Sequence, residues 1–150
     1  MRAGARAHGI RRAVRAGGAA ATVLVVAACG TDSEAGFGMP TQQSVGQVPG
    51  ERSDVEGVLR VEANGCFTLE LDDGTRPWVV WPAGTTMDAE AAVLGTTRAT
   101  DGDRLAGRGV LVDASALPGW ENADSYAHAF GAFCDAEAVG VVALDEVDRR

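Results

Sequence analysis

The chain has 150 residues with 21 acidic and 13 basic side chains, so its formal net charge at pH 7 is −8. Five of the arginines lie within residues 1–28, which contain no acid, so the remainder carries a net charge of −13. A domain this acidic repels phosphate backbones and anionic headgroups, which excludes nucleic acid as an expected partner. The 122 residues after position 28 suffice for one domain.

Residues 1–28 have the pattern of an export signal. An arginine-rich stretch precedes an apolar run at 19–29, which is about ten residues long, roughly half of what a membrane-spanning helix needs. The run ends in Val26-Ala27-Ala28-Cys29, which resembles the lipobox of bacterial lipoproteins, where small apolar residues precede a cysteine that receives diacylglycerol. The resemblance implies a lipoprotein signal peptide at 1–28 and a lipid-anchored protein on the extracytoplasmic face of the cell membrane.

Two details of this signal stay open. Arg11-Arg12 is compatible with twin-arginine export as well as with the Sec route. An ordinary secretory signal cleaved near Ala28 would leave Cys29 as a free thiol, whereas lipidation of Cys29 would add two acyl chains. Two chains give stable membrane anchoring, because a single chain binds only marginally.

The other two cysteines, Cys66 and Cys134, are expected to form a disulfide, because an exported protein folds in an oxidising compartment. Closing this loop would stabilise the fold by about 4 kcal/mol. Two free thiols, or a zinc site that includes His128, are the alternatives. The short ligand spacing of structural zinc sites is absent, so no metal and no cofactor is expected.

Residues 29–53 are rich in Gly, Ser, Thr, Gln and Pro and have no apolar period, which predicts a flexible tether. Its two large apolar side chains, Phe37 and Met39, are expected to be solvated, with docking on the domain as the alternative. The folded domain is expected at 54–150. Alternating apolar and polar residues predict its first two strands. The expected strands are 55–62, 67–72, 76–81, 105–113 and 138–144.

The first hairpin is predicted from its register. A three-residue loop at 63–65, with its glycine left-handed, pairs Val61 with Phe67 and Leu59 with Leu69. The apolar side chains of the two strands then lie on the same face of the hairpin. A two-residue turn would shift one strand by a residue and turn its apolar side chains to the opposite face.

The second hairpin is predicted with a two-residue turn at Asp73-Gly74, which places Trp78 opposite Leu69. Trp78 would then point into the core. Trp81 would point away from it, opposite Cys66, and would cover the disulfide.

The segment 86–94 has helix signals, with Thr86 as a cap and Gly95 after the end, although a strand could begin at 91. The aromatic loop at 118–133 is expected to contain one helical turn near 123–130. These elements predict a mainly β fold, a small five- to six-stranded OB-like barrel with one short helix and a disulfide.

Trp81 and the aromatic loop that contains Trp120, Tyr126, Phe130 and Phe133 could form either a packed lid over one barrel end or a ligand patch. The candidate patch residues are Trp81, Trp120, Tyr126 and His128. Ser125 and Asp124 could share a helix face with His128, but no strand–turn–helix elbow frames a serine, so no catalytic residue is assigned. Paired acids such as Asp101 and Asp103 flank glycines and are typical of turns.

Three stretches, 65–69, 78–85 and 101–105, resemble a group of small uncharacterised actinobacterial lipoproteins and secreted domains. The resemblance implies a small β-barrel on the cell envelope and carries no activity. We therefore expect a membrane-anchored lipoprotein with a non-catalytic binding or structural role. Its partners would be the membrane, through its lipid, and an envelope protein or small ligand. A small envelope hydrolase and a metal- or ligand-binding receptor domain are the alternatives.

Overall fold

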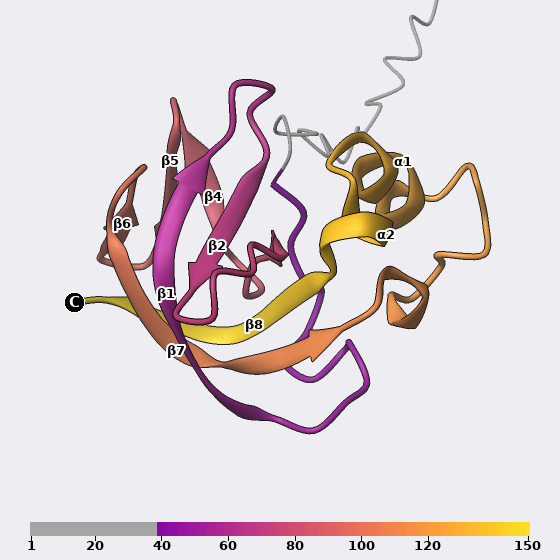
Figure 1. The fold of residues 1–150 in the computed structure, drawn as a ribbon, viewed down its shortest axis with the longest axis horizontal. Helices are drawn as coiled ribbons and strands as arrows, with labels where there is room; N and C mark the ends of the chain where they lie inside the picture. The colour runs from indigo at the N-terminus through magenta and orange to yellow at the C-terminus, as the bar shows by residue number, and fades with distance from the viewer. Residues whose placement is uncertain (1–38) are drawn as a thin grey trace, which may run out of the picture. The chain divides into compact units, whose positions relative to one another are not determined.

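The computed structural model describes residues 39–150, in which five strands form a closed barrel (Figure 1). The barrel strands are β1 (Ser53–Val61), β2 (Phe67–Leu71), β3 (Trp78–Val80), β7 (Arg104–Val112) and β8 (Val141–Arg149). Their order is β1-β2-β3-β8-β7, and all neighbours are antiparallel except β3 and β8. The predicted mainly β, OB-like barrel is confirmed.

The first hairpin has the predicted register. Val61 pairs with Phe67 and Leu59 with Leu69, across a loop in which Gly65 has a φ of 85°. A side chain at that position would be strained, because L residues rarely adopt positive φ. The three-residue loop therefore sets the inward faces of both strands.

The second hairpin differs from the prediction by one residue. Trp78 pairs with Thr68 rather than Leu69, and the turn is a three-residue loop closed by a hydrogen bond from Leu71 N to Thr75 O (2.9 Å). The Asp73 carboxylate stabilises this longer loop by accepting hydrogen bonds from Thr75 N (2.9 Å) and Thr75 Oγ1 (2.6 Å). One residue of slip exchanges the two faces of β3.

The exchange reverses the predicted places of two tryptophans. Trp81 lies in the barrel core, where its ring meets that of Phe67 edge-on with centroids 5.5 Å apart. Trp78 packs outside the barrel, in the same cluster as Cys66 and Cys134. The prediction that Trp81 covers the disulfide is wrong.

The segment expected to be a helix at 86–94 forms strands instead. A three-stranded sheet contains β4 (Thr86–Asp88), β5 (Ala91–Leu94) and β6 (Thr97–Ala99). Ala92 and Ala99 belong to the barrel core, and Arg98 pairs with Asp88. Burial against the barrel outweighs the helix preference of the alanines, since propensity is a weak prior.

The chain between β7 and β8 contains the helices. They are a 3-10 turn (Ala114–Ala116), α1 (Tyr126–Phe133) and α2 (Ala136–Val139). The helical turn expected near 123–130 is thus α1. The last strand, expected at 138–144, begins later and runs to Arg149, because α2 occupies the residues up to Val139.

The residues before β1 also pack on the barrel. Met39, Gln42 and Val48 are buried, and Gln42 N donates to Trp81 O at 2.8 Å. The prediction of a solvated linker is wrong for these three residues, because backbone hydrogen bonding fixes a segment whose composition is typical of a tether. The predicted signal peptide at 1–28, Cys29 and Phe37 lie outside the described residues.

A β-bulge at Asp145 secures this segment. The register of β7 and β8 skips Asp145, whose carboxylate accepts hydrogen bonds from Gln42 Nε2 (3.2 Å), Gly46 N (3.0 Å) and Arg52 Nε (3.1 Å). Burial raises the pKa of Asp145, but these hydrogen bonds and the Arg52 charge outweigh it, so the pKa lies below its ordinary value.

Candidate functional site

The connection between β7 and β8, residues 113–140, lies over the outer face of β3 and β8 (Figure 1). A second hydrophobic cluster fills the space between them, separate from the barrel core. It contains Val48, Cys66, Trp78, Val80, Val110, Ala114, Leu117, Trp120, Cys134, Ala136, Val141 and Ala143. Strand β3 and the first four residues of β8, 141–144, are therefore buried on both faces, which explains their continuous apolar sequences.

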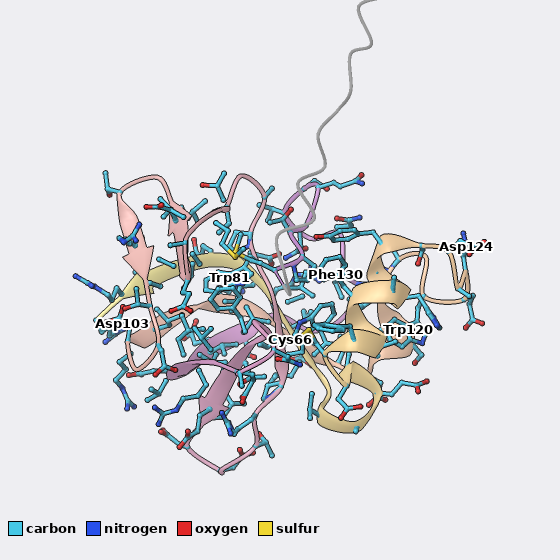
Figure 2. The ribbon with its side chains drawn as sticks, turned by 90° about the horizontal axis from the view of Figure 1, so that it is seen from above. Cys66, Trp81, Asp103, Trp120, Asp124 and Phe130 are labelled. Carbon is cyan, nitrogen blue, oxygen red and sulfur yellow. A yellow bond between two sulfur atoms is a disulfide. The ribbon has the colours of Figure 1, made fainter. Side chains whose placement is uncertain are left out.

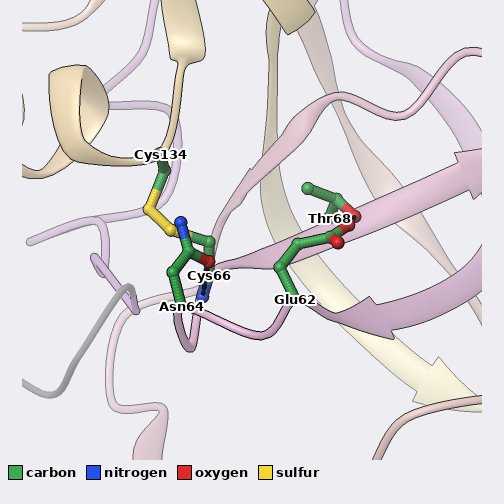
Figure 3. Close-up of a disulfide and its surroundings, with 5 residues drawn as sticks. All are labelled: Glu62, Asn64, Cys66, Thr68 and Cys134. Carbon is green, nitrogen blue, oxygen red and sulfur yellow. Dashed lines mark hydrogen bonds between the residues drawn. A yellow bond between two sulfur atoms is a disulfide. The ribbon is translucent and has the colours of Figure 1, made fainter.

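A disulfide joins this connection to the barrel. Cys66, at the end of the first hairpin loop, is bonded to Cys134 directly after α1, with the two Cα atoms 5.8 Å apart (Figure 3). Asn64 Oδ1 accepts a hydrogen bond from Cys66 N at 3.1 Å. The predicted disulfide is confirmed, and it fixes the C-terminal end of α1.

The start of α1 is fixed by polar contacts. Ser125 Oγ accepts a hydrogen bond from His128 N at 3.1 Å and so caps the helix. His128 Nδ1 donates to Trp120 O at 2.8 Å, and the His128 and Trp120 rings lie 4.9 Å apart. The Ser125 hydroxyl and the His128 Nδ1 atom are thus both engaged with backbone groups, and the contacts found do not join them as nucleophile and base.

The inner side of α1 approaches two tryptophans closely. A Cβ at Gly131 would lie 2.4 Å from Trp120 Cζ3 and 3.3 Å from Trp78 Cζ3. Only glycine allows the helix to rest on these rings. Trp120 is consequently buried beneath α1, with 7% of its surface exposed.

The outer side of α1 is aromatic and carries no charge. Tyr126, Phe130 and Phe133 occur at spacings of four and three residues along α1. Tyr126 and Phe133 lie on its exposed side, whereas Phe130 is partly buried and packs against the second hydrophobic cluster. The Tyr126 and Phe130 rings lie 4.4 Å apart, and Tyr126 and Phe133 are 41% and 57% exposed. We call these three residues the α1 surface. Partial burial raises the pKa of Tyr126 above its ordinary value.

The connection is also strongly acidic. It contains five acids and no lysine or arginine: Asp113, Glu121, Asp124, Asp135 and Glu137. None of the five takes part in an ion pair within the described residues, whereas seven arginine–carboxylate pairs involve the barrel, the small sheet and the segment before β1. Unneutralised negative charge therefore lies at both ends of α1.

The structure separates the four residues of the expected patch. Trp81 belongs to the barrel core and Trp120 lies beneath α1, as Figure 2 shows, while Tyr126 and His128 lie on α1 itself. The sequence interpretation placed Phe130 and Phe133 in the aromatic loop that could line a ligand patch, but it did not predict that Phe133 is exposed while Trp120 is buried. Their spacing from Tyr126, in a stretch without charged residues, is the signal that could have placed them on a shared helix.

Two hollows lie away from the α1 surface, and some of their polar groups are engaged within the chain. One of about 560 Å³ lies beside the first hairpin loop, where Glu62 pairs with Arg76 and Asp101 accepts from Val61 N. The other, of about 390 Å³, includes Asp73, which is bonded to Thr75. Neither has exposed aromatic residues beside acids that lack ion pairs within residues 39–150, as α1 and its two flanks do.

No three His, Cys, Asp or Glu side chains within residues 39–150 are grouped so that they could hold a metal ion. No helix in the same range has the length and apolar character needed to cross a membrane.

Comparisons with known proteins add no relative. No protein-family model, no curated protein sequence and no solved structure matches this chain.

Proposed function

We propose that the protein is a lipid-anchored lipoprotein on the extracytoplasmic face of the cell membrane, with a non-catalytic binding role. Its barrel serves as a rigid scaffold, and the α1 surface makes contact with another component of the envelope. The exposed, uncharged aromatic face of α1 is the observation that carries the proposal.

The proposed location rests on two independent features. The first is the arginine-rich, apolar and cysteine-terminated pattern of residues 1–29. The second is the Cys66–Cys134 disulfide, which is typical of proteins that fold in an oxidising compartment. The family and the actinobacterial origin implied by the sequence resemblance remain part of this proposal.

The binding role rests on the composition of α1. An exposed helix normally shows a polar outer face, and one that is apolar on every side is normally covered. Aromatic residues contribute most of the binding energy in many protein contacts, because they bury a large area with few rotatable bonds. Tyr126 and Phe133 have these properties and are partly exposed.

The anchor is tested by intact mass spectrometry of the protein extracted from membranes. We expect a chain that begins at Cys29 and carries the mass of diacylglycerol. A chain with an unmodified Cys29 thiol, or one recovered uncleaved from cytosol, would contradict the proposed location.

The binding role is tested by affinity capture with the complete lipoprotein from detergent-solubilised envelope. Wild type and a control with Val45→Ser and Leu111→Ser, two other exposed apolar residues, should retain one stoichiometric component. A variant with Tyr126→Ser and Phe133→Ser should lose it. Equal recovery with both double variants would contradict a contact at the α1 surface.

A further inference from the structure

We infer that the component bound by the α1 surface is a second protein, which offers an apolar recess with a rim of arginine or lysine side chains. The inference rests on the proposed function, because it needs the α1 surface to be a contact. It adds the chemistry of the partner, which the aromatic face alone does not specify.

The apolar part of the inference comes from the three aromatic side chains. Tyr126 and Phe133 are exposed and flank the half-buried Phe130, which stacks on Tyr126. Protein interfaces commonly have an aromatic centre within a polar rim. A recess that accepts Phe133 and Tyr126 would exclude water from both rings.

The charged part comes from the residues that flank α1. Glu121 and Asp124 precede the helix, and Asp135 and Glu137 follow it. These carboxylates lack ion-pair partners within the described part of the chain, and no lysine or arginine occurs between Arg108 and Arg149. Complementary charge on a partner would therefore be positive at both ends of the aromatic face.

The α1 surface is held in place before any partner arrives. Ser125 caps its start, the Cys66–Cys134 disulfide fixes its end, and Gly131 rests on Trp120. Binding to such a surface orders few additional side chains, which lowers the entropy cost of association.

The same charges disfavour two other occupants. An anionic membrane leaflet would repel the four carboxylates beside α1, although the aromatic rings alone would suit a lipid interface. A second copy of the chain would bring the same acids face to face in a symmetric contact. A basic protein partner satisfies both the aromatic and the acidic features.

Photo-crosslinking from the helix itself tests the inference. The complete lipoprotein is expressed in its native envelope with Phe133→p-benzoylphenylalanine, and the masses of the adducts are determined after illumination. We expect one dominant adduct with a different protein. The same photoreactive residue placed at exposed Leu111 should give little of that adduct.

A matched pair of charge variants then tests the basic rim. The first neutralises the α1 acids: Glu121→Gln, Asp124→Asn, Asp135→Asn and Glu137→Gln. Asparagine suits position 135, where Asp135 has a φ of 59°. The control neutralises four other exposed acids without ion pairs: Glu51→Gln, Asp54→Asn, Glu146→Gln and Asp148→Asn.

Both variants change the net charge by the same amount. We expect the first to lower the adduct yield about ten-fold, since four rim charges of modest individual weight act together, and the control to change it less than two-fold. Raising the salt concentration should reproduce the loss.

The outcomes separate the inference from the proposed function. A protein adduct whose yield is the same in both charge variants overturns the basic rim but keeps the α1 surface as a contact. An adduct with lipid, or with a second copy, that grows when the acids are neutralised overturns the inference in favour of that occupant. If the photoreactive residue at Phe133 gives no more adduct than the one at Leu111, the proposed contact itself is overturned.

Discussion

The barrel and the connection 113–140 differ in how far their apolar side chains are buried and their charged side chains are paired within the chain. In the barrel, apolar side chains point inward and arginines pair with acids, as Arg60 does with Glu70 and Arg104 with Glu56. In the connection, aromatic residues are exposed and five acids have no ion-pair partner within residues 39–150. The barrel is therefore complete within the chain, whereas the connection leaves aromatic residues exposed and acids unpaired within the described residues.

The ion pairs of the barrel matter here for their charge more than for their stability. Exposed pairs contribute roughly 0–1 kcal/mol each, so burial of the barrel core and of the second cluster supplies most of the stability. The pairs instead leave the barrel surface mixed in sign, while the connection keeps one sign throughout.

Removal of the disulfide should have the largest effect and should act mainly on the connection. Replacing Cys66 and Cys134 together by alanine should lower the free energy of unfolding by about 4 kcal/mol, because the bond closes a long loop. Urea unfolding measures this loss. Hydrogen exchange should accelerate more in α1 than in β1, and equal acceleration in both would contradict the separation of the two regions.

Gly107→Ala should break the barrel rather than the connection. A Cβ at Gly107 would lie 2.1 Å from the Glu146 carbonyl oxygen, so the contact is with backbone that cannot move without opening β7 from β8. We expect a loss of about 3 kcal/mol in urea unfolding. A loss below about 1 kcal/mol would show that the barrel is less tightly closed than described.

Gly131→Ala is the matching change in the connection. The Cβ would meet the Trp120 ring, which can shift, and alanine favours a helix more than glycine does. The net loss should therefore be smaller, about 1–2 kcal/mol, with a change in tryptophan fluorescence. At an exposed helix position, replacing glycine by alanine increases stability. Such a gain for Gly131→Ala would contradict the contact between α1 and Trp120.

Asp145→Asn should loosen the segment before β1 by about 1–2 kcal/mol at pH 7, because it weakens charge-assisted hydrogen bonds from Arg52 and Gly46. The Asp145 side chain is only 10% exposed. Since folding lowers its pKa, its contribution is complete above the ordinary carboxyl pKa and is lost as the pH falls through the lowered value.

Urea unfolding of wild type and Asp145→Asn across this pH range checks the prediction. The stability difference should be constant near neutral pH and should shrink in acid. If the difference in the free energy of unfolding between wild type and Asp145→Asn grew as the pH fell, it would contradict a lowered pKa for Asp145 in the folded protein.

Phe133→Ser should have the smallest effect on stability, below about 0.5 kcal/mol, because the side chain is 57% exposed. The same variant should lose binding. Trp120→Ser is its buried counterpart and should lose several kcal/mol. If Phe133→Ser destabilised the protein as strongly, the aromatic face of α1 would be a packing surface.

Local patterns predicted the fold where both partners of a contact are close in sequence. The first hairpin was predictable because only one loop length aligns its apolar faces. The second was not, because the Asp73–Thr75 hydrogen bonds favour a longer loop than the Asp73-Gly74 pair suggests. This one-residue difference in loop length determines which tryptophan lies in the barrel core.

The site was less predictable, since it depends on contacts distant in sequence. The disulfide followed from cysteine count and compartment. The burial of Trp120 and the exposure of Phe133 depend on which side of α1 faces β3, and Gly131 sets that only once the Trp78 ring is in place. Likewise, the helix signals at 86–94 carried no information about burial against the barrel.

Hydroxyl-radical footprinting of the wild-type protein shows whether the α1 surface is covered, by comparing intact envelope with purified protein. If the α1 surface is covered by a partner, oxidation of Tyr126 and Phe133 should fall several-fold in the envelope, while oxidation of exposed Leu111 stays the same. Equal oxidation of Phe133 in both samples would contradict the claim that the connection is completed by binding.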